Sequence, residues 1–110
     1  VYLSGPITPA NGYELDDNIE SALAVYLDCI RNGIPAFAPQ LGAVFPEAFE
    51  IPYETWMAYD FAVIDRCTHM LMLPRWETSS GAGREKDYAF TRGLPTFYAL
   101  EDLIAHVSRP

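Results

Sequence analysis

The residues best suited to chemistry lie in a turn of small residues that precedes a carboxylate. Ser79, Ser80, Gly81 and Gly83 follow an apolar strand pattern and open a helix that carries Glu85. Such a turn lets backbone N–H groups approach an anion closely, and the positive end of the helix faces the same place. Glu85 would repel an anion bound there, which suggests a carboxylate with a chemical task. The alternative is a first-turn acid that complements the helix dipole.

A second carboxylate, Asp60, lies in the middle of a predicted helix that leads into the strand before this turn. Asp60 and Glu85 reach one site if their two helices meet there. Paired carboxylates in different environments are the usual equipment for cleaving a glycosidic bond, because one attacks or stabilises the anomeric carbon while another group handles protons. The alternative for Asp60 is an acid on a solvated helix face.

Three aromatic residues also lie where a ligand would bind. Tyr2 is on the first predicted strand, and its hydroxyl needs a partner at the sheet edge or in a crevice. A carboxylate is one candidate for that partner, and a backbone group in the core is the other. Trp76 and Tyr13 lie in loops expected to border the crevice, where they either stack on a planar base or cover the ends of the core.

The sequence does not support other kinds of site. Gly81-Ala82-Gly83 lacks the third glycine and the later acidic residue of a dinucleotide fingerprint, and no lysine follows the glycines as in a nucleoside triphosphate loop. His69 and His106 are too isolated to predict a metal cluster. We therefore expect neither a metal nor an organic cofactor.

Alternating strand and helix patterns separate these residues. Strands are predicted at residues 1–4, 34–38, 69–73 and 94–98, helices at 14–31, 53–67, 82–92 and 100–107, and a long loop at 40–52. This alternation is typical of parallel strands joined by right-handed crossovers. We predict an α/β fold, a small doubly wound, flavodoxin-like parallel sheet of about four strands with helices on both faces. Ligands bind such sheets at the carboxyl ends of the strands, so residues 5–13 and 74–85 form two lips of one crevice if the first and third strands are neighbours.

Length and composition indicate one domain over residues 1–110. Half of the residues are hydrophobic and 20% are charged, which is a globular profile. The net charge of −8 argues against binding to a nucleic-acid polymer, because no Lys/Arg cluster is present to neutralise phosphates. No apolar run approaches the length of a membrane span, and no leader pattern begins the sequence. Cys29 and Cys67 have apolar neighbours, which favours reduced thiols and a cytoplasmic protein.

Three motifs together resemble the nucleoside 2-deoxyribosyltransferase superfamily. They are Val-Tyr-Leu-Ser-Gly-Pro-Ile-Thr at residues 1–8, the helix that carries Asp60, and Trp76-Glu77-x-Ser79-x-Gly81-Ala82-x-x-Glu85. The branch that the chain resembles most is a group of small phage and bacterial proteins that share the first and third motifs. The resemblance spans nearly the whole chain, and the order and spacing of the motifs make it fairly specific.

The resemblance implies roles for particular residues. In the superfamily a glutamate in the pattern Gly-x-Gly-x-Glu-x-x-Tyr-Ala attacks the anomeric carbon and forms a covalent glycosyl-enzyme, and this glutamate falls on Glu85. Asp60 falls where the family places a residue that contacts the sugar and assists catalysis, and Tyr2 falls where a tyrosine orients the nucleophile. The residues expected to contact substrate are Gly5, Pro6, Ile7, Thr8, Tyr13, Trp76, Ser79, Ser80, Gly81 and Gly83.

One position departs from the transferases. Two residues before the first glycine they carry an aspartate that manages protons on the base, whereas this chain has Ser79. A serine there resembles the nucleotide hydrolase branch, which cleaves nucleoside 5′-monophosphates and uses the hydroxyl on the phosphate. The arginine that those hydrolases carry in the first loop is absent from Ile7-Thr8-Pro9, and Arg84 and Arg75 are the candidates to replace it.

The resemblance therefore implies an N-glycosidase that acts on a nucleotide or 2′-deoxynucleotide by double displacement, without a metal or organic cofactor. Base exchange, in which a second nucleobase accepts the sugar, and a non-catalytic nucleotide-binding module are the alternatives. Because related proteins assemble as dimers or larger, a homodimer or higher assembly is also expected.

Overall fold

The computed structural model describes residues 1–7 and 15–108, so Thr8 and Tyr13 lie outside the described residues. Its elements in chain order are β1 (Tyr2–Ser4), α1 (Leu15–Arg31), η1 (Pro39–Val44), η2 (Pro46–Glu50), α2 (Tyr53–Ile64), β2 (Met70–Met72), η3 (Trp76–Thr78), α3 (Ser80–Thr91), β3 (Thr96–Phe97) and α4 (Leu100–Val107). The η elements are 3₁₀ helices.

The three strands form an all-parallel sheet in the order β1-β2-β3. Tyr2 is paired with Met70 and Ser4 with Met72, so β1 and β2 end at the same level. The first strand and the strand that precedes the small-residue turn are therefore neighbours. This arrangement places the loops after β1 and β2 side by side at one edge of the sheet.

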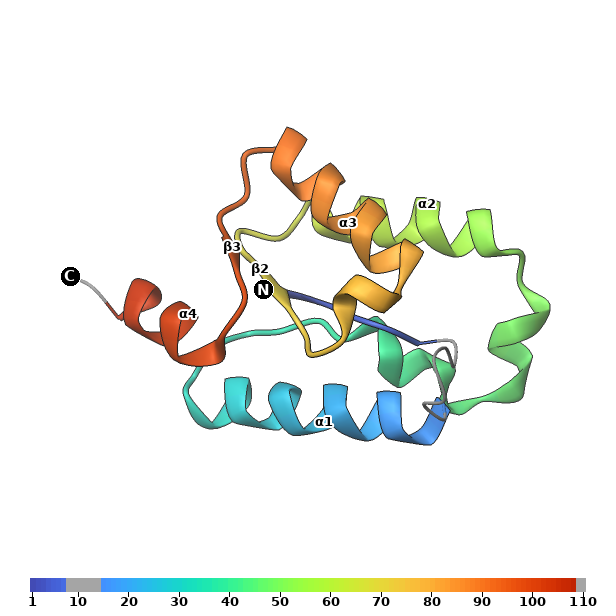
Figure 1. The fold of residues 1–110 in the computed structure, drawn as a ribbon, viewed down its shortest axis with the longest axis horizontal. Helices are drawn as coiled ribbons and strands as arrows, with labels where there is room; N and C mark the ends of the chain where they lie inside the picture. The colour runs from blue at the N-terminus through green and yellow to red at the C-terminus, as the bar shows by residue number, and fades with distance from the viewer. Residues whose placement is uncertain (8–14, 109–110) are drawn as a thin grey trace.

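Helices cover both faces of the sheet, and side chains alternate between them. Leu3 and Leu71 pack in one core cluster with Ala22 of α1 and Leu103 of α4. The other face of β1 and β2 packs in a second cluster with residues of α2 and α3. Figure 1 shows the same layers, with α2 and α3 on one side of the strands and α1 on the other. The predicted α/β fold, a parallel sheet with helices against it, is confirmed.

The predicted strand at 34–38 is reduced to one bridge, between Phe37 and Tyr2. Phe37 donates its N–H to Val1 and accepts one from Leu3. The next donor along the chain in a parallel ladder would be residue 39, which is a proline without an N–H. The amide of Gln40 takes its place and donates to the carbonyls of Leu3, at 3.4 Å, and Gly5, at 3.3 Å.

The strands are shorter than predicted, and other elements also differ from the sequence-based prediction. The segment 40–52, predicted as a loop, contains the 3₁₀ helices η1 and η2, each opened by a proline. The helix predicted at 53–67 ends at Ile64, so Cys67 follows it. α3 begins two residues before the predicted 82, because the Ser79 hydroxyl caps it by accepting the Ala82 N–H at 3.1 Å.

Both cysteines are free thiols, Cys29 buried and Cys67 partly buried. Among the helices of residues 1–7 and 15–108, none is long and apolar enough to cross a membrane.

Candidate functional site

Glu85 is buried at the carboxyl end of β1, and each of its carboxylate oxygens accepts a hydrogen bond from a hydroxyl group. The Tyr2 hydroxyl donates to Oε2 at 2.7 Å, and the Ser4 hydroxyl donates to Oε1 at 2.8 Å. Only 4% of Glu85 is exposed. Glu85 thus lies in the second turn of α3 and is fixed by the neighbouring strand, so it is not a first-turn acid that complements the helix dipole.

The local pattern of β1 explains this arrangement. Residues two apart on a strand face the same side, so Tyr2 and Ser4 both face α3. The Ser4 hydroxyl also lies 3.5 Å from the Ala82 carbonyl of that helix. The small side chain at position 4 leaves room for the carboxylate of Glu85, and Tyr2 is fixed from behind by Phe37, whose ring stacks on it at 5.8 Å.

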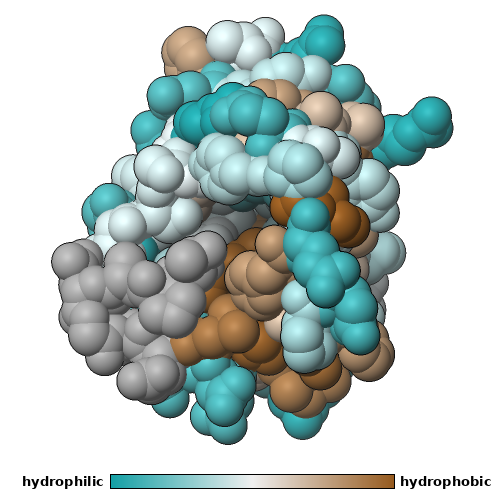
Figure 2. Space-filling view, turned by 90° about the vertical axis from the view of Figure 1, so that its right-hand side faces the viewer, coloured by the Kyte–Doolittle hydropathy of each residue, from teal (hydrophilic) through white to brown (hydrophobic). Residues whose placement is uncertain are grey.

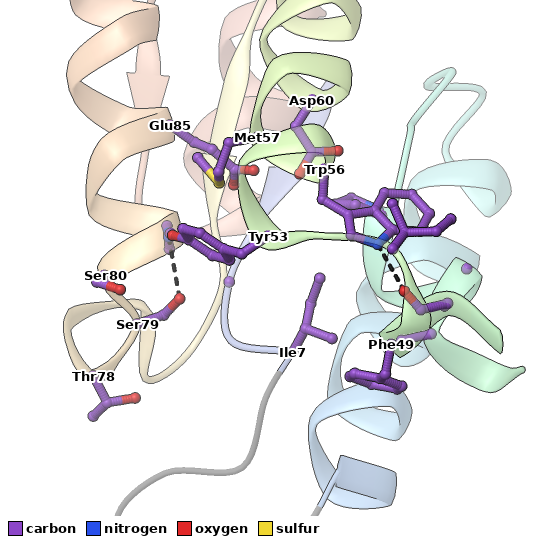
Figure 3. A pocket seen from close by; sticks show the side chains of 18 residues that line it. Ile7, Phe49, Tyr53, Trp56, Met57, Asp60, Thr78, Ser79, Ser80 and Glu85 are labelled. Carbon is purple, nitrogen blue, oxygen red and sulfur yellow. Dashed lines mark hydrogen bonds between the residues drawn. The ribbon is translucent and has the colours of Figure 1, made fainter. Parts of the chain in front are cut away.

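Asp60 brings a second carboxyl group to the same place from α2. It is 5% exposed, and its Oδ1 is buried without a hydrogen-bond partner among the described residues. Figure 3 shows the carboxyl groups of Asp60 and Glu85 directed into the space between α2 and α3. The structure therefore brings together Tyr2, Asp60 and Glu85, the three residues proposed from the sequence to be catalytic.

The two carboxyl groups perturb each other. Burial, with the interaction with Asp60, raises the pKa of Glu85 to about 8. Burial also raises the pKa of Asp60. Two buried acids that interact this closely titrate as a pair and share one proton over a range of pH. Burial and the two carboxylates raise the pKa of the Tyr2 hydroxyl, which stays a donor.

Hydrogen bonding stabilises one arrangement of the shared proton. Glu85 accepts two O–H donors, and these stabilise a carboxylate. Asp60 Oδ1 accepts none. These donors stabilise the form of the singly protonated pair that has its charge on Glu85 and its proton on Asp60, which is the form that nucleophilic attack with proton transfer requires.

The two carboxyl groups line the inner end of a cavity of about 410 Å³. Hydroxyl groups of Thr78, Ser79 and Ser80 line one side of it. The opposite wall is mainly apolar and comes from the loop after β1, η1, η2 and α2: Ile7, Pro39, Ala43, Ala48, Phe49, Ile51, Tyr53, Trp56 and Met57. Figure 2 shows apolar side chains gathered beside a hollow on this face. The cavity thus combines a reactive acidic end with an apolar wall suited to a planar group.

Asn18 of α1 joins the two loops that border the cavity. Its Nδ2 donates to the carbonyl of Ile7 at 3.1 Å, and its Oδ1 accepts from Arg75 Nη2 at 2.8 Å. Arg75 has the left-handed backbone φ of 66°, uncommon outside glycine. Gly5 packs so closely on the second loop that a Cβ there would lie 2.7 Å from Leu73 Cβ. These contacts hold the exits of β1 and β2 in a fixed relation.

The substrate-contact residues proposed from the sequence divide into two groups. Gly5, Ile7, Ser79, Ser80 and Gly81 line the cavity. Among the described residues Pro6, Trp76 and Gly83 are not part of its wall.

Trp76 packs elsewhere. Its ring lies 5.9 Å from that of Tyr98, and Lys86 lies 5.6 Å over its face. This is the arrangement of a residue that covers the end of the core, one of the two alternatives open from the sequence.

Neither arginine considered for phosphate binding is part of the cavity wall. Arg84 forms a bidentate ion pair with Glu54 on the outer surface, at 2.7 and 3.1 Å, and so links α3 to α2. Arg75 is held by Asn18, as above.

Sequence reasoning missed Ser4 and most of the apolar wall. Ser4 had a signal, since it lies two residues from Tyr2 on a strand. The wall residues Phe49, Ile51 and Trp56 belong to a segment without a clear period, where sequence gives no indication of which side chains face a cavity. Trp56 is fixed there by its indole N–H, which donates to the Ala48 carbonyl at 2.8 Å.

In the part of the chain that the structure describes, no group of three or more His, Cys, Asp or Glu residues could hold a metal ion.

The comparisons with known proteins add a family but no activity. A family model described as a domain of unknown function, DUF4406, matches residues 1–98. No curated protein matches the sequence. The matched region extends from β1 through β3 and contains every residue of the site described above.

Proposed function

We propose that this chain, which belongs to the DUF4406 family, cleaves the N-glycosidic bond of a nucleoside or nucleotide through a covalent intermediate on Glu85. One observation carries the proposal. A buried carboxylate is fixed by two hydroxyl donors beside a second carboxyl group, at the inner end of a cavity large enough for a small ligand. The resemblance of its motifs to the nucleoside 2-deoxyribosyltransferase superfamily supports the same reading.

In the first step the Glu85 carboxylate attacks C1′ of the sugar. A bond forms between a Glu85 oxygen and C1′ while the bond from C1′ to the base nitrogen breaks. The electron pair of the broken bond goes to the base, which takes the proton held by Asp60. The ionised Glu85 and the protonated Asp60 act together, because Glu85 supplies the electron pair that forms the new bond and Asp60 supplies the proton to the departing base.

In the second step water resolves the glycosyl-enzyme. Asp60, now ionised, takes a proton from water as the water oxygen attacks C1′. The bond from C1′ to Glu85 breaks, and its electron pair returns to the carboxylate. The sugar leaves with a hydroxyl at C1′, and the pair is restored with its proton on Asp60.

Tyr2 and Ser4 are positioning residues in this scheme. Their hydroxyl groups fix the orientation of the Glu85 carboxylate before attack, so that little reorganisation accompanies the reaction. The apolar wall keeps bulk water from the intermediate while the base departs. The small-molecule substrate, the absence of a cofactor requirement and assembly as a homodimer or higher remain proposals of the same kind.

The test is chromatographic detection of free base from a panel of nucleosides, 2′-deoxynucleosides and their 5′-monophosphates. Glu85→Gln preserves the shape of the side chain, and we expect it to lower base release by at least about 10⁴-fold, as loss of a nucleophile does. The control is Glu20→Gln, at an exposed position of α1. Rapid denaturation during turnover, followed by mass spectrometry of the chain, should show one added glycosyl group on the wild type. Normal turnover by Glu85→Gln would reject the assignment.

The apolar wall gives specific support to a second candidate, base exchange. An intermediate shielded by Phe49, Ile51 and Trp56 survives longer before water reaches it, which lets a second base take the sugar. Adding a free base and observing a new nucleoside separates exchange from hydrolysis. Ligand-induced thermal stabilisation without base release from any substrate would instead indicate a non-catalytic binding module.

A further inference from the structure

Asp60 and Glu85 are the charged side chains among the described residues that line the cavity. The chain as a whole has a net charge of −8. The charge that a ligand meets in this cavity is therefore negative.

Part of the small-residue turn that would hold a phosphate is engaged in its own hydrogen bonds. The Ser79 hydroxyl accepts the Ala82 N–H, and the Ser79 carbonyl accepts the Gly83 N–H at 3.1 Å. The Tyr53 hydroxyl lies over Gly81, 3.1 Å from where a Cβ would be. The Ala82 N–H is thus committed to the Ser79 cap and the Gly83 N–H to the helix itself, and the Tyr53 hydroxyl lies over Gly81.

Asp60 favours a ligand that brings a hydrogen-bond donor or a positive charge. Its Oδ1 is buried without a partner among the described residues, and Asp60 lines the cavity. A buried acceptor in this state is satisfied by a ligand that supplies a hydrogen-bond donor or a cation. The aromatic rings of Tyr53 and Trp56 in the same wall also attract a cation.

We propose that the cavity selects its substrate by charge, taking a nucleoside without a phosphate group, most readily one with a positively charged base, and rejecting the 5′-monophosphate. The proposal rests on the glycosidase function and narrows its substrate class. It also reverses the expectation of a monophosphate substrate that Ser79 raised. A cationic base, such as an N7-alkylated purine or an N-ribosyl pyridinium, departs as a neutral molecule when it takes the electron pair of the broken bond. It therefore needs no proton from Asp60.

The size of the effect follows from Coulomb's law. One carboxylate charge about 6 Å from a phosphate charge, at an effective dielectric of about 20, changes binding by about 100-fold. We expect a 5′-monophosphate to bind about 100-fold more weakly than its nucleoside. Part of the gain for a cation is offset by loss of its hydration, so a cationic nucleoside should bind about 10-fold more tightly than its neutral parent.

The experiment compares guanosine, N7-methylguanosine and guanosine 5′-monophosphate, with the 2′-deoxy forms and the adenine and cytosine nucleosides and monophosphates in parallel. Binding is measured by calorimetry on Glu85→Gln, and base release by the wild type is divided by the uncatalysed rate of each compound. Added to Glu85→Gln, Asp60→Asn should reduce the binding preference for the cationic base by about 10-fold, whereas Asp102→Asn at an exposed position of α4 should leave it unchanged. Thr78→Arg, at the exposed rim of the cavity, should improve binding of the monophosphate.

The outcomes distinguish the charge selection from the glycosidase function on which it rests. Tighter binding and faster cleavage of the neutral nucleoside than of its monophosphate, with the cationic base best, supports the charge selection. Faster cleavage of the monophosphates overturns it and leaves the glycosidase function intact. Base release from none of the compounds rejects the glycosidase function itself.

Discussion

Replacing Glu85 with glutamine should stabilise the fold at alkaline pH while removing the proposed activity. Glutamine has nearly the same shape, can exchange hydrogen bonds with the hydroxyl groups of Tyr2 and Ser4, and carries no charge. The wild-type carboxyl group is buried beside Asp60, and these surroundings raise its pKa to about 8. The protein must therefore bury a second negative charge as the pH rises, whereas Glu85→Gln does not.

Proton binding determines the direction in which the stability of the fold changes with pH. Between the ordinary pKa of 4.5 and the raised value of about 8, the folded protein binds more protons at the Asp60–Glu85 pair than the unfolded chain does. The stabilisation is complete below pH 4.5 and is lost as the pH rises through about 8. At 1.36 kcal/mol per pH unit the loss reaches about 5 kcal/mol as an upper limit. Domains of this size have a total unfolding free energy of about 5–15 kcal/mol.

Urea unfolding of both proteins at pH 5, 7 and 9 measures the difference. At pH 5 the unfolding free energies of the two proteins should agree to within about 1 kcal/mol, because in both of them the site then buries at most one negative charge. At pH 9 the midpoint of Glu85→Gln should be higher by more than about 1 M urea, given a slope of about 1–3 kcal/mol per molar. Glu20→Gln controls for the loss of an exposed charge. Parallel pH profiles of wild type and Glu85→Gln would refute the description of Glu85 as a buried acid coupled to Asp60.

Three further predictions concern the same site and its supports. For a neutral substrate the rate should follow a bell-shaped pH profile, rising as the pair loses its first proton and falling near pH 8 as it loses the second; a rate still rising at pH 9 would contradict the proton transfer from Asp60. Tyr2→Phe removes a donor to the Glu85 carboxylate and should lower kcat by about 10- to 100-fold while moving the acid limb to higher pH, whereas Tyr59→Phe, on an exposed ring, should change neither. Gly5→Ala should cost about 1–3 kcal/mol of stability because its Cβ meets Leu73, while Gly83→Ala, in open space inside α3, should add about 0.5–1 kcal/mol; thermal unfolding of both variants checks this pair.

The sequence predicted the parts of the site that depend on local pattern. The period of two on the first strand placed Tyr2 on one face, and the serine-glycine turn located the start of the helix that carries Glu85. The short spacing between that turn and Glu85 then placed the carboxylate close to the turn. What the sequence could not provide was the orientation of Asp60, because α2 is apolar over much of its surface and offers no stripe that indicates its buried side.

The missing fourth strand has a simple physical origin. Prolines at positions 35 and 39 flank the segment, and each removes a backbone donor. The apolar run between them satisfied the pattern of a buried strand, which says nothing about where its hydrogen bonds go. Gln40 was not recognised as a substitute donor because a side-chain amide can complete a ladder only when the tertiary fold brings it there.

The order of the strands explains why the site is at this position. Phe37 bridges to β1 on the side opposite β2. After β1 the chain therefore first goes to one side of that strand, at Phe37, and then crosses to its other side, where β2 and β3 lie. The loops after β1 and β2 therefore lead to helices on opposite faces, α1 and α3, and a crevice opens between them. Glu85 belongs to the helix after β2, and Tyr2 and Ser4 belong to β1, so their hydrogen bonds cross that reversal. A fold with β1 and β2 separated by another strand would leave Glu85 without either hydroxyl donor, and its burial would then be too costly to keep.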